Sequence, residues 1–85
     1  MTDKEKREMT NALDFLTKGT HGDWVCADGG WYVEIADIQA GKYVVYDCFD
    51  RLIGFTDKAL IAVMFLATGK FTDTDGKVHD VRLYD

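Results

Sequence analysis

The chain has 85 residues, of which 47% are hydrophobic and 13% aromatic, and its formal net charge at pH 7 is −5. This length and composition predict one small domain over residues 1–85 and exclude intrinsic disorder. All of the net charge arises after Lys18, because the segment before it is neutral. An acidic chain without a basic cluster disfavours direct binding to nucleic acid or to membranes.

The first segment predicts a helix over Asp3–Lys18. Thr2 and Glu5 have the spacing of a capping box, and Gly19 is a natural helix end. One stripe of the helix is apolar, which predicts that this face docks on the domain; it comprises Met9, Ala12, Leu13 and Leu16. The polar opening has no signal-peptide or membrane-span character, so we expect a soluble, cytoplasmic protein.

The middle of the chain predicts an antiparallel meander. Strands at Trp24–Ala27 and Trp31–Ile38 flank the hairpin signal Asp28-Gly29-Gly30. A three-residue loop over Gln39-Ala40-Gly41 leads into a third strand, with Gly41 left-handed because alanine resists a positive φ. That loop pairs Ile38 with Lys42, Ile35 with Val45, Glu34 with Tyr46 and Val33 with Asp47. After a turn through Phe49, Asp50 and Arg51, a brief strand covers Leu52–Phe55.

Alternation along these strands separates two faces. The predicted core face holds Trp31, Val33, Ile35, Tyr43, Val45 and Phe49, with Asp37 and Asp47 near its margins. The other face holds Tyr32, Glu34, Ala36, Ile38, Val44, Tyr46 and Cys48.

A second helix is predicted over residues 57–68, with Thr56 as its N-cap and Gly69 just beyond its end. It is apolar from Ala59 to Ala67 and has no polar face. A final hairpin pairs Lys70–Asp73 with Lys77–Tyr84, placing Phe71 opposite His79 and Lys70 opposite Asp80. The expected fold is therefore α+β: a helix, a meander of three to four strands, an apolar helix and a hairpin, with both helices packed on one antiparallel sheet.

The residues argue against an enzyme. The chain has no serine, and its two histidines, His21 and His79, lie in a predicted loop and strand. Cys26 and Cys48 lack the spacing of a zinc or redox site and are expected to be reduced core thiols. Nucleotide-binding glycine motifs are absent. We predict no catalytic residues, no cofactor and no metal ligands.

Two acidic groups are candidate cation sites. Asp47, Asp50 and Asp57 would form a magnesium site if the segment Phe55–Asp57 returned beside the third strand. Local turn and helix-start roles explain Asp50 and Asp57 better. Asp73 and Asp75 resemble the start of a calcium loop, but Tyr84 stands where such a loop needs glutamate, and turn chemistry explains the motif.

Two surfaces indicate partners. If the first helix leaves the second sheet face open, this face binds another protein that has a basic surface; if the helix covers it, the tyrosines are core. The sequence leaves both outcomes open. The predicted binding residues are Tyr32, Glu34, Asp37, Tyr46, Asp47 and Asp50. The apolar helix is either the core helix or a homodimer interface, with Ile61 and Phe65 as its expected contacts.

The leading hypothesis is a small acidic, non-catalytic protein that binds and inhibits or modulates another protein. In size, acidity and lack of catalytic groups the chain resembles the small inhibitors that phages and mobile elements encode, including anti-CRISPR and anti-restriction proteins. The resemblance is one of composition. If the target is a nucleic-acid-binding protein, the expected mechanism is steric or electrostatic occlusion of its basic channel by carboxylates that stand in for phosphates. The alternatives are a small-molecule or divalent-metal-binding module and a structural homo-oligomer subunit.

Overall fold

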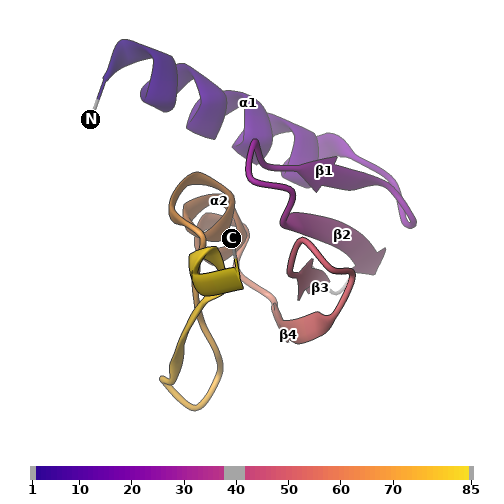
Figure 1. Cartoon of the computed structure of the whole chain (residues 1–85). Coiled ribbons are helices and arrows are strands. Elements are labelled where there is room, and N and C mark those ends of the chain that lie inside the picture. Colours follow the sequence, from indigo (N-terminus) through magenta and orange to yellow (C-terminus); the bar gives the residue numbers. More distant parts are fainter. Residues whose placement is uncertain (1, 38–41, 85) are drawn as a thin grey trace.

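A computed structural model describes residues 2–37 and 42–84 of the chain. It confirms the α+β fold. The elements are α1 (Asp3–Lys18), β1 (Trp24–Cys26), β2 (Tyr32–Asp37), β3 (Lys42–Tyr46), β4 (Leu52–Thr56), α2 (Ala59–Thr68), β5 (Lys70–Thr72), β6 (Val78–Asp80) and a short 3-10 helix, η1 (Val81–Tyr84). The first four strands form an antiparallel sheet in the order β1-β2-β3-β4, and β5 and β6 pair separately (Figure 1). No described helix is long and apolar enough to span a membrane.

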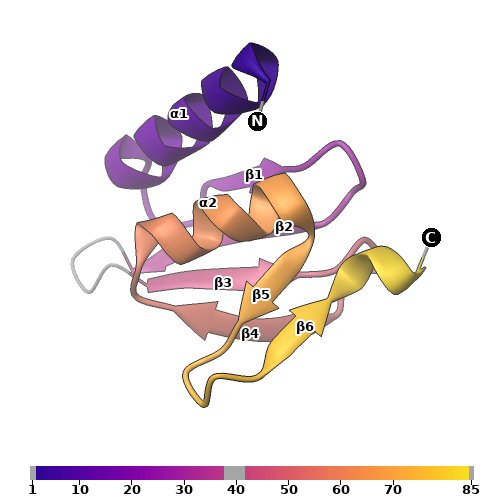
Figure 2. The same cartoon turned by 90° about the vertical axis from the view of Figure 1, so that its left-hand side faces the viewer.

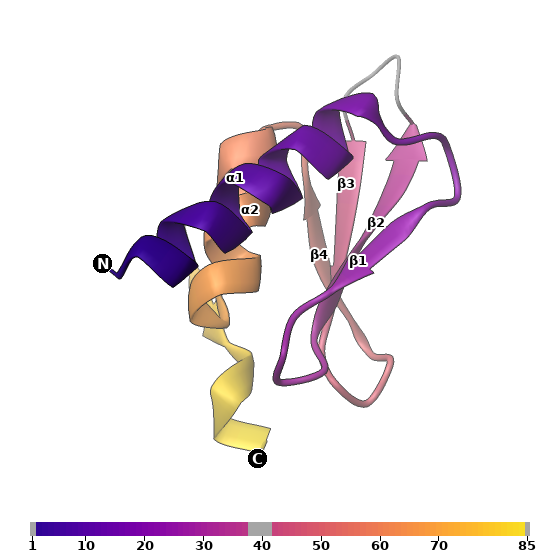
Figure 3. The same ribbon diagram turned by 90° about the horizontal axis from the view of Figure 1, so that it is seen from above.

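Both helices lie on the same face of the four-stranded sheet. Figure 2 shows α2 and the β5–β6 hairpin in front of the sheet, with α1 alongside α2 near β1. Seen from above, the opposite face has no helix over it (Figure 3). The sequence left open whether the first helix covers the Tyr32 and Tyr46 face, and the structure shows that it does not.

The ends of α1 follow the predicted signals. The backbone N–H of Glu5 donates to the Thr2 hydroxyl at 3.2 Å, and the Thr2 hydroxyl donates to the Glu5 carboxylate at 3.1 Å. At the other end, the Gly19 N–H donates to the Phe15 carbonyl at 2.7 Å. These bonds give partners to backbone N–H and C=O groups at the helix ends that have none within the helix.

The core lies between the sheet and the helices, as the predicted core face requires. Two polar side chains tie the layers together there: the Trp31 indole N–H donates to the Leu66 carbonyl and the Tyr43 hydroxyl donates to the Leu16 carbonyl, each at 3.2 Å. The fully or nearly fully buried apolar residues are Leu16, Trp31, Val33, Ile35, Tyr43, Val45, Ala62, Val63, Phe65, Phe71 and Val81.

The predicted pairing of β2 with β3 was wrong by two residues. Ile35 pairs with Tyr43 rather than Val45, and Val33 pairs with Val45 rather than Asp47. An irregularity between Ile35 and Asp37 shifts the register at the end of β2. Because side chains alternate with a period of two, a shift of two residues leaves the side chains of Tyr32–Ile35 and Tyr43–Tyr46 on their predicted faces. The predicted turn over residues 39–41 and the Ile38–Lys42 pair lie outside the described residues.

Three turns of the chain share one hydrogen-bond pattern, at residues 27–31, 47–51 and 73–77. In each, the first residue's N–H donates to the fifth residue's carbonyl, and the fourth residue's N–H donates back to the first carbonyl. The fourth residue has a positive φ in every case: 95° at Gly30, 63° at Asp50 and 83° at Gly76. The first residue of two of these turns is an aspartate whose carboxylate accepts the N–H groups two and four residues later. Asp47 accepts those of Phe49 and Arg51. Asp73 accepts those of Asp75 and Lys77, which confirms turn chemistry for the Asp73 motif.

The second half of the chain differs from expectation at two element ends. Helix α2 begins at Ala59, because Thr56 is the last residue of β4 and its hydroxyl accepts the Lys58 N–H at 3.1 Å instead of capping the helix. The last strand ends at Asp80, and η1 follows it. The pairing of Lys70 with Asp80 and of Phe71 with His79 is confirmed.

Gly69 ends α2 in the left-handed conformation, with φ 74°, as predicted. A Cβ at Gly69 would lie 2.5 Å from Cγ of Arg82, whereas a Cβ at Gly22, with φ 93°, would meet nothing within 4 Å. We therefore expect Gly69→Ala to lower the free energy of unfolding by about 2 kcal/mol or more, and Gly22→Ala to cost only the backbone strain of about 1 kcal/mol. Urea denaturation of both variants measures this; equal losses would contradict the close-packing part of the argument.

Candidate protein-binding face

The uncovered face of the four-stranded sheet carries two rows of side chains that cross all four strands. Strand pairing sets one row as Cys26, Tyr32, Tyr46 and Leu52, and the other as Trp24, Glu34, Val44 and Phe55. We call these eight residues the open face. The Trp24 residue is 59% exposed and Phe55 is 56% exposed, so large apolar side chains at both edges meet solvent.

Two stacked tyrosines form the centre of the open face. The rings of Tyr32 and Tyr46 lie 4.7 Å apart with an interplanar angle of 12°, and Trp24 meets Tyr32 edge-on at 5.8 Å. Such contacts between aromatic rings stabilise beyond the area that they bury. The three rings are thus held in one arrangement by contacts within the chain.

Each stacked tyrosine is bonded to a carboxylate. The Tyr46 hydroxyl donates to Glu34 Oε1 at 3.3 Å, and Tyr32 is hydrogen-bonded to Asp50, from the turn between β3 and β4. Burial and the Asp50 carboxylate raise the pKa of Tyr32 to about 12. Burial, followed by the charge and hydrogen bond of Glu34, also raises the pKa of Tyr46. Both tyrosines therefore stay neutral donors at any physiological pH.

Asp50 adopts a conformation that favours glycine. It has a φ of 63°, where the equivalent residues of the two sister turns are Gly30 and Gly76. Aspartate tolerates this region better than most residues, yet it still carries backbone strain there. What Asp50 contributes in return is its hydrogen bond to Tyr32 on the open face.

Four of the predicted binding residues therefore come together: Tyr32, Glu34, Tyr46 and Asp50. Asp47 does not lie with them. Its side chain is 1% exposed and lies on the core side of the sheet, as its face predicted. There it accepts the N–H groups of Phe49 and Arg51 and a 2.9 Å bond from Arg51 Nε. Asp37 pairs with Lys42 at the end of β2, and its side chain lies outside the described part of the structure.

The magnesium alternative finds no support in the described residues. Asp47 is occupied by Arg51, and no three carboxylate, histidine or cysteine side chains among residues 2–37 and 42–84 come close enough to hold a metal ion. The carboxylates Asp47, Asp50 and Asp57 thus do not converge there.

Three further expectations need correction. Phe65 is fully buried, so it offers no contact to a second copy; Ile61 is half-buried and Leu60 beside it is 63% exposed. Cys26 is exposed and Cys48 half-buried, so these free thiols are not core residues. Phe49 is exposed because the turn after Tyr46 directs it outward, and the Arg51 guanidinium lies 5.3 Å from its ring centre.

Four members of the open face were not predicted from the sequence: Trp24, Cys26, Leu52 and Phe55. Trp24 pairs with Glu34 and Phe55 pairs with Val44, so both lie on the face to which the sequence had assigned Glu34 and Val44. The alternation of β4 was obscured by the irregularity where Val45 pairs with Gly54 but Tyr46 pairs with Leu52.

Comparisons with protein-family models, curated proteins and solved structures found no match for this chain.

The buried Asp47 carboxylate predicts acid sensitivity. Burial alone raises its pKa, but the N–H groups and guanidinium that it accepts outweigh burial and hold the pKa below its usual value. A depressed folded-state pKa means that the carboxylate contributes stability above about pH 4, and that this contribution is lost as the pH falls through the folded-state pKa. We expect Asp47→Asn to be destabilised by about 2 kcal/mol at pH 7 and to lose less stability than wild type between pH 5 and pH 2. Urea denaturation across this range measures both.

The surface variant Asp57→Asn is the matched control for this charge change. An Asp47→Asn protein with the acid sensitivity of Asp57→Asn would contradict the assignment.

The tyrosine–carboxylate pairs predict how each tyrosine titrates when its carboxylate is neutralised. Glu34→Gln should lower the pKa of Tyr46, and Asp50→Asn should lower the pKa of Tyr32 from about 12, because each change removes a neighbouring negative charge. Asp50→Asn is the control for Tyr46, because Asp50 is not among the groups that raise the pKa of Tyr46. Glu34→Gln should lower the pKa of Tyr32 less than Asp50→Asn does, because Glu34 makes the smaller contribution there. NMR of the tyrosine Cζ carbons between pH 9 and 13 follows both titrations; a pKa of Tyr46 that is unmoved by Glu34→Gln would refute the pair.

Proposed function

We propose that this chain is a small non-catalytic protein that binds another protein through the open face and thereby inhibits or modulates it. One observation carries the proposal: an uncovered sheet face presents a fixed aromatic stack, two carboxylates and exposed apolar side chains at its edges. Contiguous exposed apolar surface of this kind marks interaction sites, and tryptophan and tyrosine dominate binding energies at protein interfaces.

The open face is also organised in advance. Binding costs free energy when flexible side chains become ordered, and Tyr32 and Tyr46 already have their rings stacked and their hydroxyls bonded. Tyrosine offers a large amphipathic contact with few rotatable bonds. The stack therefore suits the centre of an interface, and Trp24 and Phe55 suit its flanks.

The charges on this face indicate a partner with basic residues. Glu34 lies within the rows and Asp50 at one end of them, and the eight residues of the open face include neither lysine nor arginine. Arginine from a partner would meet both the carboxylates and the aromatic ring faces. We expect an apolar patch with adjoining arginine or lysine residues.

The face does not favour imitation of nucleic acid. Its two carboxylates are each bonded to a tyrosine, and the rest of its side chains are aromatic or apolar. The proposal still includes a steric mechanism, in which the chain covers a basic functional surface of its partner. Phage-type targets, namely CRISPR effectors and restriction enzymes, are the partners to test first.

A paired capture experiment tests the proposal. Immobilised wild type, Trp24→Ala, Glu34→Lys and Leu60→Ala are compared for recovery and affinity of a partner from the organism that encodes the chain. We expect Trp24→Ala and Glu34→Lys each to weaken binding tenfold or more, which corresponds to about 1.4 kcal/mol. Leu60→Ala, an equally exposed change on α2, should leave binding unchanged.

Asp50→Gly separates binding from folding. Glycine relieves the positive φ while the Tyr32 bond is lost, so stability should stay within about 1 kcal/mol of wild type. Binding should weaken nonetheless. A partner whose affinity falls with Leu60→Ala but not with the open-face variants would place the interface on α2 instead.

A further inference from the structure

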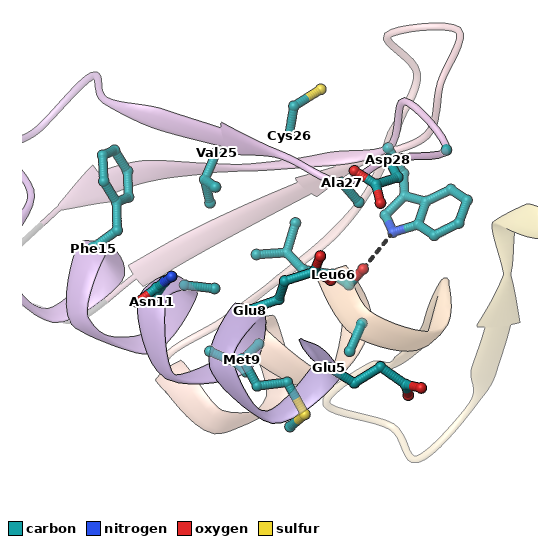
Figure 4. A pocket seen from close by; sticks show the side chains of 15 residues that line it. Glu5, Glu8, Met9, Asn11, Phe15, Val25, Cys26, Ala27, Asp28 and Leu66 are labelled. Atoms are coloured by element: carbon teal, nitrogen blue, oxygen red, sulfur yellow. Dashed lines mark hydrogen bonds between the residues drawn. The ribbon is translucent and has the colours of Figure 1, made fainter. Parts of the chain in front are cut away.

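A cleft lies on the other side of β1, between that strand and α1. It has a volume of about 560 Å³, and its lining includes Trp31 and, from α2, Val63, Leu66 and Ala67. Because strand residues alternate, Val25 and Ala27 line this cleft while Trp24 belongs to the open face. Figure 4 shows the Cys26 side chain pointing away from it. The cleft is thus separate from the proposed protein-binding face.

The two ends of the cleft differ in chemistry. Glu5, Glu8 and Asp28 stand toward one end, and Phe15 and Val25 toward the other (Figure 4). Residues 5 and 15 of α1 are separated by about 15 Å along the helix. The apolar walls are completed by Met9, Ala12, Ala27, Val63, Leu66 and Ala67.

The charge inside the cleft has one sign. Its lining among the described residues includes three carboxylates and neither lysine nor arginine. Lys4 approaches Glu8 only at 4.0 Å, in a pair exposed to solvent that contributes little. The Trp31 N–H already donates to the Leu66 carbonyl, so the indole offers no donor to an anion.

We propose that this cleft binds a small organic cation with an apolar body. Its ammonium or guanidinium group lies among Glu5, Glu8 and Asp28, and its body lies between Ala12, Phe15 and Val25. A volume of 560 Å³ falls within the range of about 300–1,000 Å³ in which proteins enclose most of a small ligand. The apolar walls supply burial, and the carboxylates select the sign of the charge.

Three matched probes test the charge selection: 4-phenylbutylamine, 4-phenylbutanol and 4-phenylbutyrate share one apolar body and differ in charge. Two-dimensional amide NMR of the full chain follows each titration. We expect saturable shifts in residues 5–15, 25–31 and 63–67. The amine should bind at least threefold more tightly than the alcohol, and the carboxylate most weakly.

Two variants with the same change of net charge locate the site. Glu8→Gln with Asp28→Asn should abolish the preference for the amine over the alcohol. Asp57→Asn with Asp75→Asn, two exposed aspartates that do not line the cleft, should preserve it. Ala12→Leu, which fills the apolar wall, should weaken all three probes alike.

Equal affinities for the three probes, shifts outside the cleft or an equal loss in the control pair would overturn the proposal. The amide spectra also show whether each variant is folded. These outcomes are independent of the open face, so either proposal can fail without the other.

Discussion

The arrangement of the molecule depends on the Trp31 side chain. Its indole is buried at the start of β2 and donates to the Leu66 carbonyl, which fixes the C-terminal part of α2 against the sheet. The ring leaves no room for a side chain at Gly29, and a Cβ at Gly69 would lie 3.3 Å from it. The first hairpin, the sheet and the end of α2 therefore meet on one ring. Because α1 packs on α2, this contact also decides which sheet face receives both helices.

Because both helices lie on one face of the sheet, the residues of the other face can only contact one another and solvent. Exposing aromatic side chains of a sheet to water is unfavourable, because apolar surface is more stable when it is removed from water. Here Tyr32 and Tyr46 bury part of that surface against each other, and Glu34 and Asp50 satisfy their hydroxyls. Trp24, Leu52 and Phe55 remain exposed at the edges. The face is ordered internally but not covered, and these two properties are the basis for proposing it as a protein-binding surface.

The sequence predicted the elements and the sheet faces better than it predicted individual contacts. Alternation placed Val33, Ile35 and Val45 in the core even though their pairing was wrong by two residues. A shift by an even number of residues keeps each side chain on the same face of the sheet. The position of α1 was not predictable, because an amphipathic stripe does not say which surface it meets. The role of Asp47 depends on a turn that brings Arg51 beside it. The Asp73 turn shows the same local pattern, because its aspartate also accepts two backbone N–H groups.

Some carboxylates of the chain have their charge countered by a cationic neighbour, and among the described residues those of the open face do not. Asp47 is paired with Arg51, and Asp80 is paired with Arg82, which lowers the pKa of Asp80 to about 2. Glu34 and Asp50 instead accept bonds from tyrosine hydroxyls, which are neutral and do not cancel the negative charge. Covering these two carboxylates with a purely apolar surface would remove water from charged groups without compensation. Any protein that binds the open face must therefore bring cationic side chains of its own.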